Sequence, residues 1–253
     1  MILRAALLLS LFSLLAGCVS SGNVDPMKTD KGRTEAHDAY VQLGIGYLQQ
    51  GATERAKTPL RKALELDPSS ADAHAALGLV FQTEMEPELA DKHFRAALSQ
   101  RGNDPRFLNN YGGFLYEQKR YKEAYERYEQ ASADTLYPDR SRIFENMGMT
   151  AVQLKQPELA KKHFTRSLRL NSQQPRALLE MAFLSYEDKE YVPARGYYEA
   201  YSQLAGQTAR SLLLGSRLAR VYEDRDRAAS LGLQLKRLYP GTPEYKQYLS
   251  EQQ

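Results

Sequence analysis

The chain has 253 residues, of which 42% are hydrophobic and 26% are charged, and its formal net charge is +3. This balance is typical of a folded protein and excludes wholesale disorder. The 34 basic and 31 acidic residues leave too small a positive excess to bind phosphates, so we expect no nucleic-acid partner. A single Cys excludes an internal disulfide and any zinc site that needs two or more cysteines.

Residues 1–17 have the layout of a secretory signal peptide. Arg4 precedes an apolar run from Ala5 to Ala16, which is too short for a membrane span of about 20 residues. The sequence Leu15-Ala16-Gly17-Cys18 that ends it resembles the bacterial lipobox. The resemblance implies cleavage before Cys18 and a covalent lipid on its thiol. The alternative is a buried structural Cys that follows an apolar run by chance.

Removal of the signal peptide leaves 33 basic and 31 acidic residues on a chain that is anchored rather than membrane-spanning. At about 0.8 kcal/mol per buried CH₂, several acyl chains hold a protein on a membrane. In lipoproteins of this kind an Asp after the Cys is the usual inner-membrane retention signal, whereas Val19 and Ser20 follow here. The resemblance therefore implies the periplasmic face of the outer membrane. Residues 18–34 lack an apolar period, which predicts a flexible tether.

A repeat of about 34 residues follows the tether. Gly44, Gly78, Gly112 and Gly148 are separated by 34, 34 and 36 residues. Twelve residues after each Gly stands an Ala, and sixteen residues after each stands a large side chain: Leu60, Phe94, Tyr128 and Phe164. Each unit contains two helical apolar stripes separated by a short polar break, which indicates a pair of helices. The pattern resembles the tetratricopeptide repeat (TPR).

The resemblance implies an all-α fold, a right-handed α-solenoid of about six TPR helix pairs with a C-terminal capping helix. The TPR domain is expected over residues 35–253. Its units are expected at 35–70, 71–104, 105–140, 141–174, 175–208 and 209–242, and the terminal helix at 243–251. Two registers remain open for the sixth unit, with either Ser216 or Gly215 at the reference Gly position.

No chemistry-bearing motif stands out in the sequence. It has no Gly-x-Ser-x-Gly turn and no phosphate-binding Gly-rich loop. His93 and His163 occupy equivalent positions two units apart, on the order of 20 Å, so they cannot share a metal. His74 is expected to be a packing residue. We therefore expect a non-enzyme with no catalytic, cofactor-binding or metal-binding residues, no small-molecule substrate, and no cofactor besides the lipid on Cys18.

Stacked helix pairs curve and create a concave surface lined by the first helix of each unit. The TPR resemblance places inward the positions two, three and six before the reference Gly, and one, four and five after it. Arg106 and Arg176 fall on these positions, and so does a set that we predict to form a partner-binding groove: Asn109, Asn110, Gly113, Tyr116, Arg142, Asn146, Met149, Phe183 and Tyr186.

Two amides are central to this predicted groove. Asn110 and Asn146 stand where the family often places an Asn that holds a peptide backbone, because an amide both donates and accepts. The alternative is that each Asn hydrogen-bonds within its own repeat. Gly113 would allow a ligand chain to come close, and Tyr116, Phe183 and Tyr186 would act as aromatic anchors.

Further segments carry a more specific resemblance. They are Leu108–Leu115, Tyr121–Ala124, and the loop from Leu136 to Pro138 that leads to Asn146-Met147-Gly148. With the lipobox they resemble the PilF/PilW family of type IV pilus biogenesis lipoproteins, the pilotins. That implies a protein partner, the secretin of the type IV pilus, whose subunits are bound and brought to the outer membrane to multimerise. The alternative is a periplasmic TPR scaffold lipoprotein for other cell-envelope machinery, and repeats alone do not distinguish the two.

Overall fold

The structure, a computed structural model, describes residues 26–252. The predicted signal peptide, Cys18 and residues 19–25 of the predicted tether lie outside this range. The all-α prediction is confirmed over the described residues, which form a short 3₁₀ helix, η1 (Pro26–Lys28), and a run of α-helices. Their bounds are α2 (Asp30–Gln49), α3 (Thr53–Leu66), α4 (Ala71–Thr83), α5 (Pro87–Gln100), α6 (Pro105–Glu117), α7 (Tyr121–Ser132), α8 (Arg140–Gln153), α9 (Pro157–Leu170), α10 (Pro175–Glu187), α11 (Tyr191–Leu204), α12 (Ala209–Val221), α13 (Arg225–Leu238) and α14 (Pro243–Ser250).

The predicted tether extends too far along the chain, because α2 begins at Asp30 rather than after Thr34. The Thr29 hydroxyl caps this helix by accepting a hydrogen bond from the Gly32 N–H at 3.0 Å. The side chain of His37 further along the helix lies 2.8 Å from the hydroxyl of Ser70, which caps α4 of the next unit. The polar composition of this segment concealed a capped helix that is anchored on its neighbours.

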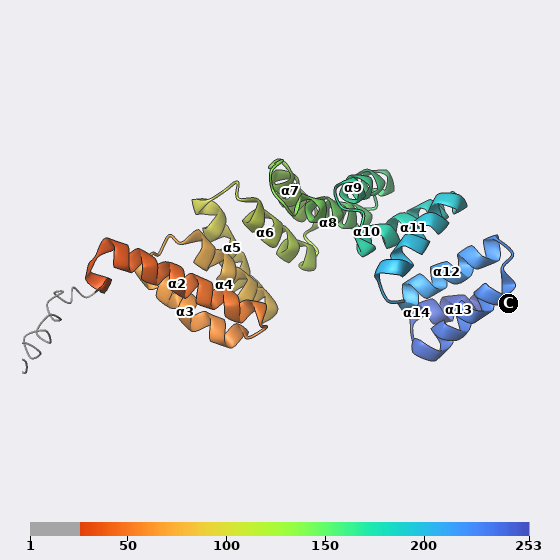
Figure 1. The fold of residues 1–253 in the computed structure, drawn as a ribbon, viewed down its shortest axis with the longest axis horizontal. Helices are drawn as coiled ribbons and strands as arrows, with labels where there is room; N and C mark the ends of the chain where they lie inside the picture. Colours follow the sequence, from red (N-terminus) through yellow and green to blue (C-terminus); the bar gives the residue numbers. More distant parts are fainter. Residues whose placement is uncertain (1–25, 253) are drawn as a thin grey trace, which may run out of the picture.

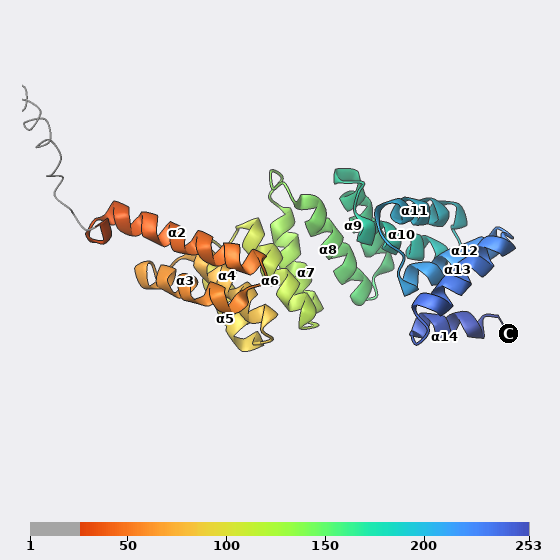
Figure 2. The same cartoon turned by 60° about the horizontal axis from the view of Figure 1, so that its bottom comes forward.

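The helices form six antiparallel pairs that succeed one another along an arch (Figure 1). Figure 2 shows the same succession from another side, with α2 at one end and α14 at the other. Consecutive first helices contact one another, as α4 does α6 and α6 does α8, whereas the described residues show no contact between consecutive second helices. The first helices α4, α6, α8, α10 and α12 therefore line the tighter, inner side of the arch.

A small residue on the first helix lets the second helix of each unit approach closely. A Cβ added at Gly78 would lie 2.8 Å from the Phe94 ring, and one added at Gly148 would lie 2.5 Å from the Phe164 ring. Both rings are 0% exposed, so neither has room to move away. The recurring Gly and the large residue sixteen positions later are thus two halves of one contact.

The turn inside each unit uses a left-handed residue. It stands seven positions after the reference residue in every unit: Gly51, Met85, Lys119, Lys155, Lys189 and Glu223, with φ between 58° and 72°. In the third unit the Lys119 N–H donates to the Tyr116 carbonyl at 3.0 Å and the Arg120 N–H donates to the Leu115 carbonyl at 2.9 Å. This is a Schellman ending, in which five of the six units use a residue with a side chain where Gly is usual.

The same spacing decides the register of the sixth unit. With Ser216 as the reference, the left-handed Glu223 follows after seven residues and α13 begins after nine, as in the second to fifth units. Ser216 is 0% exposed, and its hydroxyl donates to the Ala228 carbonyl at 3.3 Å. Ser216, not Gly215, therefore holds the reference position.

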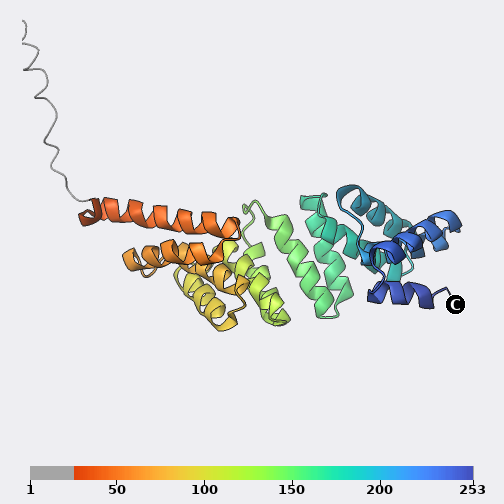
Figure 3. The same ribbon diagram turned by 90° about the horizontal axis from the view of Figure 1, so that it is seen from below.

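The terminal helix α14 packs against the sixth unit (Figure 3). In this unit Gly232 stands where earlier units carry a large side chain, and a Cβ on it would collide with the Tyr248 hydroxyl of α14. Tyr245 and Tyr248 cover a buried cluster that includes Leu212 and Leu235. The terminal helix thus supplies the aromatic side chain that the sixth unit lacks.

Candidate functional site

The nine residues of the predicted groove lie on three successive inner helices. Asn109, Asn110, Gly113 and Tyr116 are on α6, Arg142, Asn146 and Met149 are on α8, and Phe183 and Tyr186 are on α10. Arg142 is exposed and the other eight are partly exposed. The structure therefore brings them to one continuous inner surface, which we call the groove.

The amides of the groove form a contact between repeats. Asn146 Nδ2 donates to Asn109 Oδ1 at 3.0 Å, which joins α8 to α6. The alternative that each Asn bonds within its own repeat is therefore wrong for Asn146. Asn110 makes no hydrogen bond with the described residues, so both its donor and its acceptor remain open to a ligand.

Two of the three predicted aromatic anchors, Tyr116 and Tyr186, each pack against another tyrosine. Tyr116 meets Tyr121 edge to face with ring centroids 5.3 Å apart, and Tyr186 meets Tyr191 at 5.5 Å. Burial raises the pKa of the Tyr116 and Tyr186 hydroxyls. In each pair one tyrosine fixes the ring of the other, which reduces the entropy lost when a ligand packs against it.

An arginine stands six residues before the reference position in four consecutive units: Arg106, Arg142, Arg176 and Arg210. All four lie near the beginning of an inner helix and are exposed. Sequence reasoning identified single arginines but missed the row, because Arg210 joins it only when Ser216 is the reference. The recurrence of Arg at a spacing of 34 to 36 residues was the available signal.

Carboxylates from the preceding unit accompany three of these arginines. Arg106 lies 3.5 Å from Asp72, and Arg176 lies 3.9 Å from Glu145. Arg210 holds Glu180 through both guanidinium nitrogens, with Nη2 donating to Oε2 at 3.0 Å. Burial raises the pKa of Glu145, although Arg176 and the Ala177 N–H act in the opposite direction. Arg142 has no carboxylate partner within ion-pair distance among the described residues.

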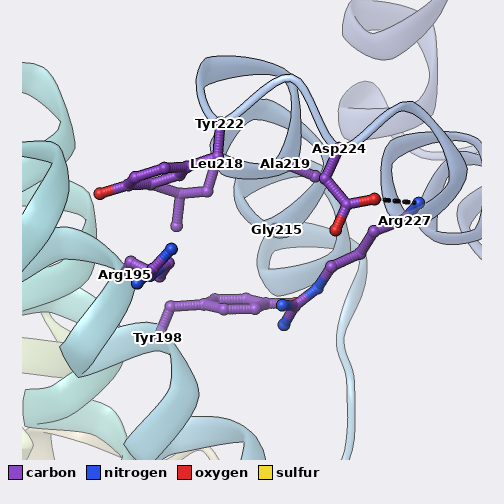
Figure 4. Close-up of a pocket in the computed structure, with 8 residues that line it drawn as sticks. All are labelled: Arg195, Tyr198, Gly215, Leu218, Ala219, Tyr222, Asp224 and Arg227. Atoms are coloured by element: carbon purple, nitrogen blue, oxygen red, sulfur yellow. Dashed lines mark hydrogen bonds between the residues drawn. The ribbon is translucent and has the colours of Figure 1, made fainter.

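The junction of the fifth and sixth units contains a small, partly open pocket (Figure 4). Arg195 lies beside the Tyr222 ring, 4.3 Å from its centroid, and the side chain of Arg227 passes near Tyr198. Glu199 lies 3.7 Å from Arg195 and 4.0 Å from Arg227. Glu199 and Asp224, which lines the pocket, together balance the charges of the two arginines. The pocket therefore has no strong preference for an anion, and we place the candidate site in the groove.

The histidines pair with other side chains instead of forming a metal centre. His74 Nδ1 lies 2.9 Å from His93 Nδ1, a contact that the sequence did not reveal, and Tyr125 bonds His163 Nε2 at 2.9 Å. Burial lowers the pKa of both His93 and His163 to about 4, with His74 contributing at His93. Between residues 26 and 252 no three His, Cys, Asp or Glu side chains gather closely enough to hold a metal ion.

None of the helices within residues 26–252 has the length and apolar character needed to cross a membrane.

Comparison with known proteins assigns the family. A tetratricopeptide repeat model matches residues 104–173, and a TPR repeat model matches residues 46–83. The type IV pilus assembly protein PilF of Pseudomonas aeruginosa is 64% identical over 251 residues, which cover 99% of this chain and 100% of that protein. The chain belongs to the PilF family. This confirms the family that the sequence motifs indicated.

Solved structures agree with the assignment. A structure of P. aeruginosa PilF is 66% identical, covers 87% of this chain and 100% of its own, and superposes with a TM-score of 0.85. The crystal structure of PilW, a widely conserved type IV pilus biogenesis factor, is 27% identical in sequence and has a TM-score of 0.74. The match covers 85% of this chain and 99% of the PilW chain. The PilF-like fold is thus the TPR solenoid that the repeat predicts.

Proposed function

We propose that this chain acts in type IV pilus biogenesis as a pilotin. It is anchored by a lipid on Cys18 to the periplasmic face of the outer membrane, where it binds secretin subunits and promotes their localisation and multimerisation. The identity of 64% along the whole chain to a type IV pilus assembly protein carries this proposal. The role is non-catalytic and rests on protein binding.

The groove supports a role in binding an extended protein segment. Asn110 has an unoccupied amide, and the rings of Tyr116 and Tyr186 are already held in place. Backbone hydrogen bonds to amides and packing on fixed rings need no particular side-chain sequence in the ligand. The lipid would raise the concentration of any bound subunit at the membrane, because tethering turns later encounters into local ones.

Deletion of the gene, followed by complementation, tests the proposal. We expect the deletion strain to lose outer-membrane secretin multimers and surface pili, and the wild-type gene to restore both. Complementation with Cys18→Ser should leave monomeric secretin, or secretin multimers in the wrong membrane. Normal outer-membrane multimers and pili in the deletion strain would refute the pilotin role and favour a scaffold role for other envelope machinery.

The groove has its own test. Asn110→Ala with Asn146→Ala should weaken binding of secretin in a pull-down and leave the helical circular dichroism signal unchanged. Arg169→Gln is the control, because Arg169 is exposed on the outer helix α9 and lies outside the groove. If the double variant binds secretin as well as wild type does, the groove is not the binding surface.

A further inference from the structure

The junction between the third and fourth units departs from its neighbours in one respect. At the next two junctions the carboxylate facing the arginine comes from Glu145 and Glu180, three and two residues before the reference position. The equivalent residues of the third unit are Asn109 and Asn110. The arginine remains there as Arg142, but the acid that would pair with it is replaced by amides.

Arg142 makes no direct contact with another acid among the described residues. It is exposed, and among the described residues its guanidinium forms no ion pair or hydrogen bond. Glu145 lies three residues further along α8, but it is 4% exposed and its Oε1 accepts from the Ala177 N–H at 3.2 Å. Its carboxylate therefore bonds to the following unit, and Arg142 acts on it only through the longer-range attraction that helps to lower its pKa.

The amides around Arg142 complete an arrangement of donors. Asn146 lies one helical turn after Arg142 on the same face of α8 and is bonded to Asn109. Asn110, on the adjacent helix, has an unused side-chain N–H group. A guanidinium beside amide donors is suited to a carboxylate, which accepts several hydrogen bonds at once.

The chain itself shows that its inner helices accept a carboxylate from a separate segment. Glu251, just beyond α14, is held by Arg217 and Arg220 of α12. Arg217 Nε lies 3.1 Å from Glu251 Oε1, and Arg220 Nη2 lies 2.6 Å from Oε2. These arginines stand one and four positions after Ser216, where the third unit has groove residues Gly113 and Tyr116.

We propose that Arg142, with Asn110 and the Asn109–Asn146 pair, binds the side-chain carboxylate of an Asp or Glu in an extended partner segment that crosses α6 and α8. The partner supplies the acid that the chain provides for itself at the other three junctions of the arginine row. This deepens the proposed function by giving the bound segment an acidic residue at a defined place, and it rests on that function only for the identity of the partner.

Peptide binding tests the site without the secretin. The probes are two fluorescein-labelled 12-residue peptides of Ala and Ser, one with a central Glu-Ala-Glu and the other with Gln-Ala-Gln. For the mature chain we expect the Glu peptide to bind about three- to tenfold more tightly, since the pair is partly exposed. The preference should decrease when NaCl rises from 50 to 500 mM, because salt screens exposed charges.

Three variants test which residues produce the preference for the Glu peptide. Arg142→Gln should remove it, and Asn110→Glu should also remove it by supplying the missing acid within the chain. Arg169→Gln changes an exposed arginine on outer helix α9 that makes no ion pair or hydrogen bond with the described residues, and it should keep the preference. Equal binding of the two peptides by wild type, or a preference that persists in Arg142→Gln with an unchanged melting temperature, would overturn the site.

The secretin is then measured separately with the same variants. Normal secretin multimers in a deletion strain would refute the pilotin role without changing the peptide result. Conversely, if the wild-type protein showed no preference for the Glu peptide, the proposed carboxylate-binding site would be refuted even if secretin assembly depended on the protein.

Discussion

The second helices of the second and fourth units have almost the same sequence and make different connections. Residues 87–94 and 157–164 differ only at Asp91 and Lys161. Asp91 accepts hydrogen bonds from Tyr111 and Arg120 of the third unit, both at 2.9 Å, and from Arg95 of its own helix. Lys161 instead forms an ion pair with Asp188 of the fifth unit and another with Glu158.

The two residues occupy a position that joins consecutive units along the whole arch. It lies thirteen residues after the reference, and its side chain contacts the following unit in each of the first five units. The contacts are Lys57 with Glu84, Asp91 with Arg120, Tyr125 with His163, Lys161 with Asp188, and Arg195 with the Tyr222 ring. The packing inside a unit is repeated, whereas the contact between units varies: only the first and fourth junctions share one, a Lys paired with an acid of the next unit.

Charge reversal at this position should have the largest effect. Burial alone would raise the pKa of Asp91, but hydrogen bonds from Arg95, Tyr111 and Arg120 hold it below its usual range. Asp91→Lys removes that acceptor and adds a cation beside two arginines, so we expect a loss of about 2–4 kcal/mol in the free energy of unfolding. Lys161→Asp should cost about 1 kcal/mol, because Glu158 and Asp188 are more exposed. Urea unfolding measures both, and equal costs would show that the two junctions are equivalent.

The contact between the reference Gly and the buried ring is present in both units, so changes to it should destabilise the two units by more similar amounts. Gly148→Ala and Gly78→Ala each force a methyl group against a buried ring and should cost about 1–3 kcal/mol. Gly148→Ala should cost more, because its added Cβ comes 0.3 Å closer to the ring, 2.5 against 2.8 Å. Gly46→Ala is the control: no atom lies within 4 Å, and Ala should stabilise the helix by about 0.5–1 kcal/mol. Thermal unfolding of the three variants would contradict this if Gly46→Ala were the least stable.

Lowering the pH should weaken both units through His93 and His163. Their folded pKa of about 4 lies below the ordinary histidine pKa of 6.5, so the unfolded chain takes up protons first as pH falls. Above pH 6.5 these groups should leave the free energy of unfolding almost unchanged. Between pH 6.5 and 4 it should decrease by about 1–3 kcal/mol for each histidine, where the upper value uses the full separation of the two pKa values and the lower value allows for solvent screening. His93→Phe and His163→Phe should each flatten the decrease in urea midpoint over this range. An unchanged slope in both would rule out these histidines as its source.

The smallest effect is expected at the left-handed turns. Met85 and Lys155 occupy the same position in the two units, with φ of 58° and 59°. Gly at either position should relieve backbone strain and raise the free energy of unfolding by about 0.5 kcal/mol after the greater entropy of unfolded Gly is counted. Matched increases in melting temperature for Met85→Gly and Lys155→Gly would confirm that the turns are equivalent, and a decrease in either would contradict it.

The sequence by itself determined the features that repeat within 34 residues. The paired helices and the close contact of each recurring Gly with Leu60, Phe94, Tyr128 or Phe164 follow from spacing, because each helix must present its apolar stripe at a fixed period. The family was indicated by the resemblance of particular segments, not by spacing. The groove residues were predicted from the positions that the TPR resemblance places inward, since a residue's position in the unit fixes the helix face on which it lies. The lipid on Cys18 remains a prediction from the lipobox alone.

The tertiary structure decided what depends on the rotation from one unit to the next. The bond between Asn146 and Asn109, the pairing of His74 with His93, and the unpaired Arg142 all involve side chains brought together from different helices. The assignment of Ser216 as the reference residue depended on the left-handed turn at Glu223. The sequence does not predict that turn, because Glu rarely adopts positive φ. Local periodicity specifies a unit, but the contact between two units depends on their relative angle, which no single unit encodes.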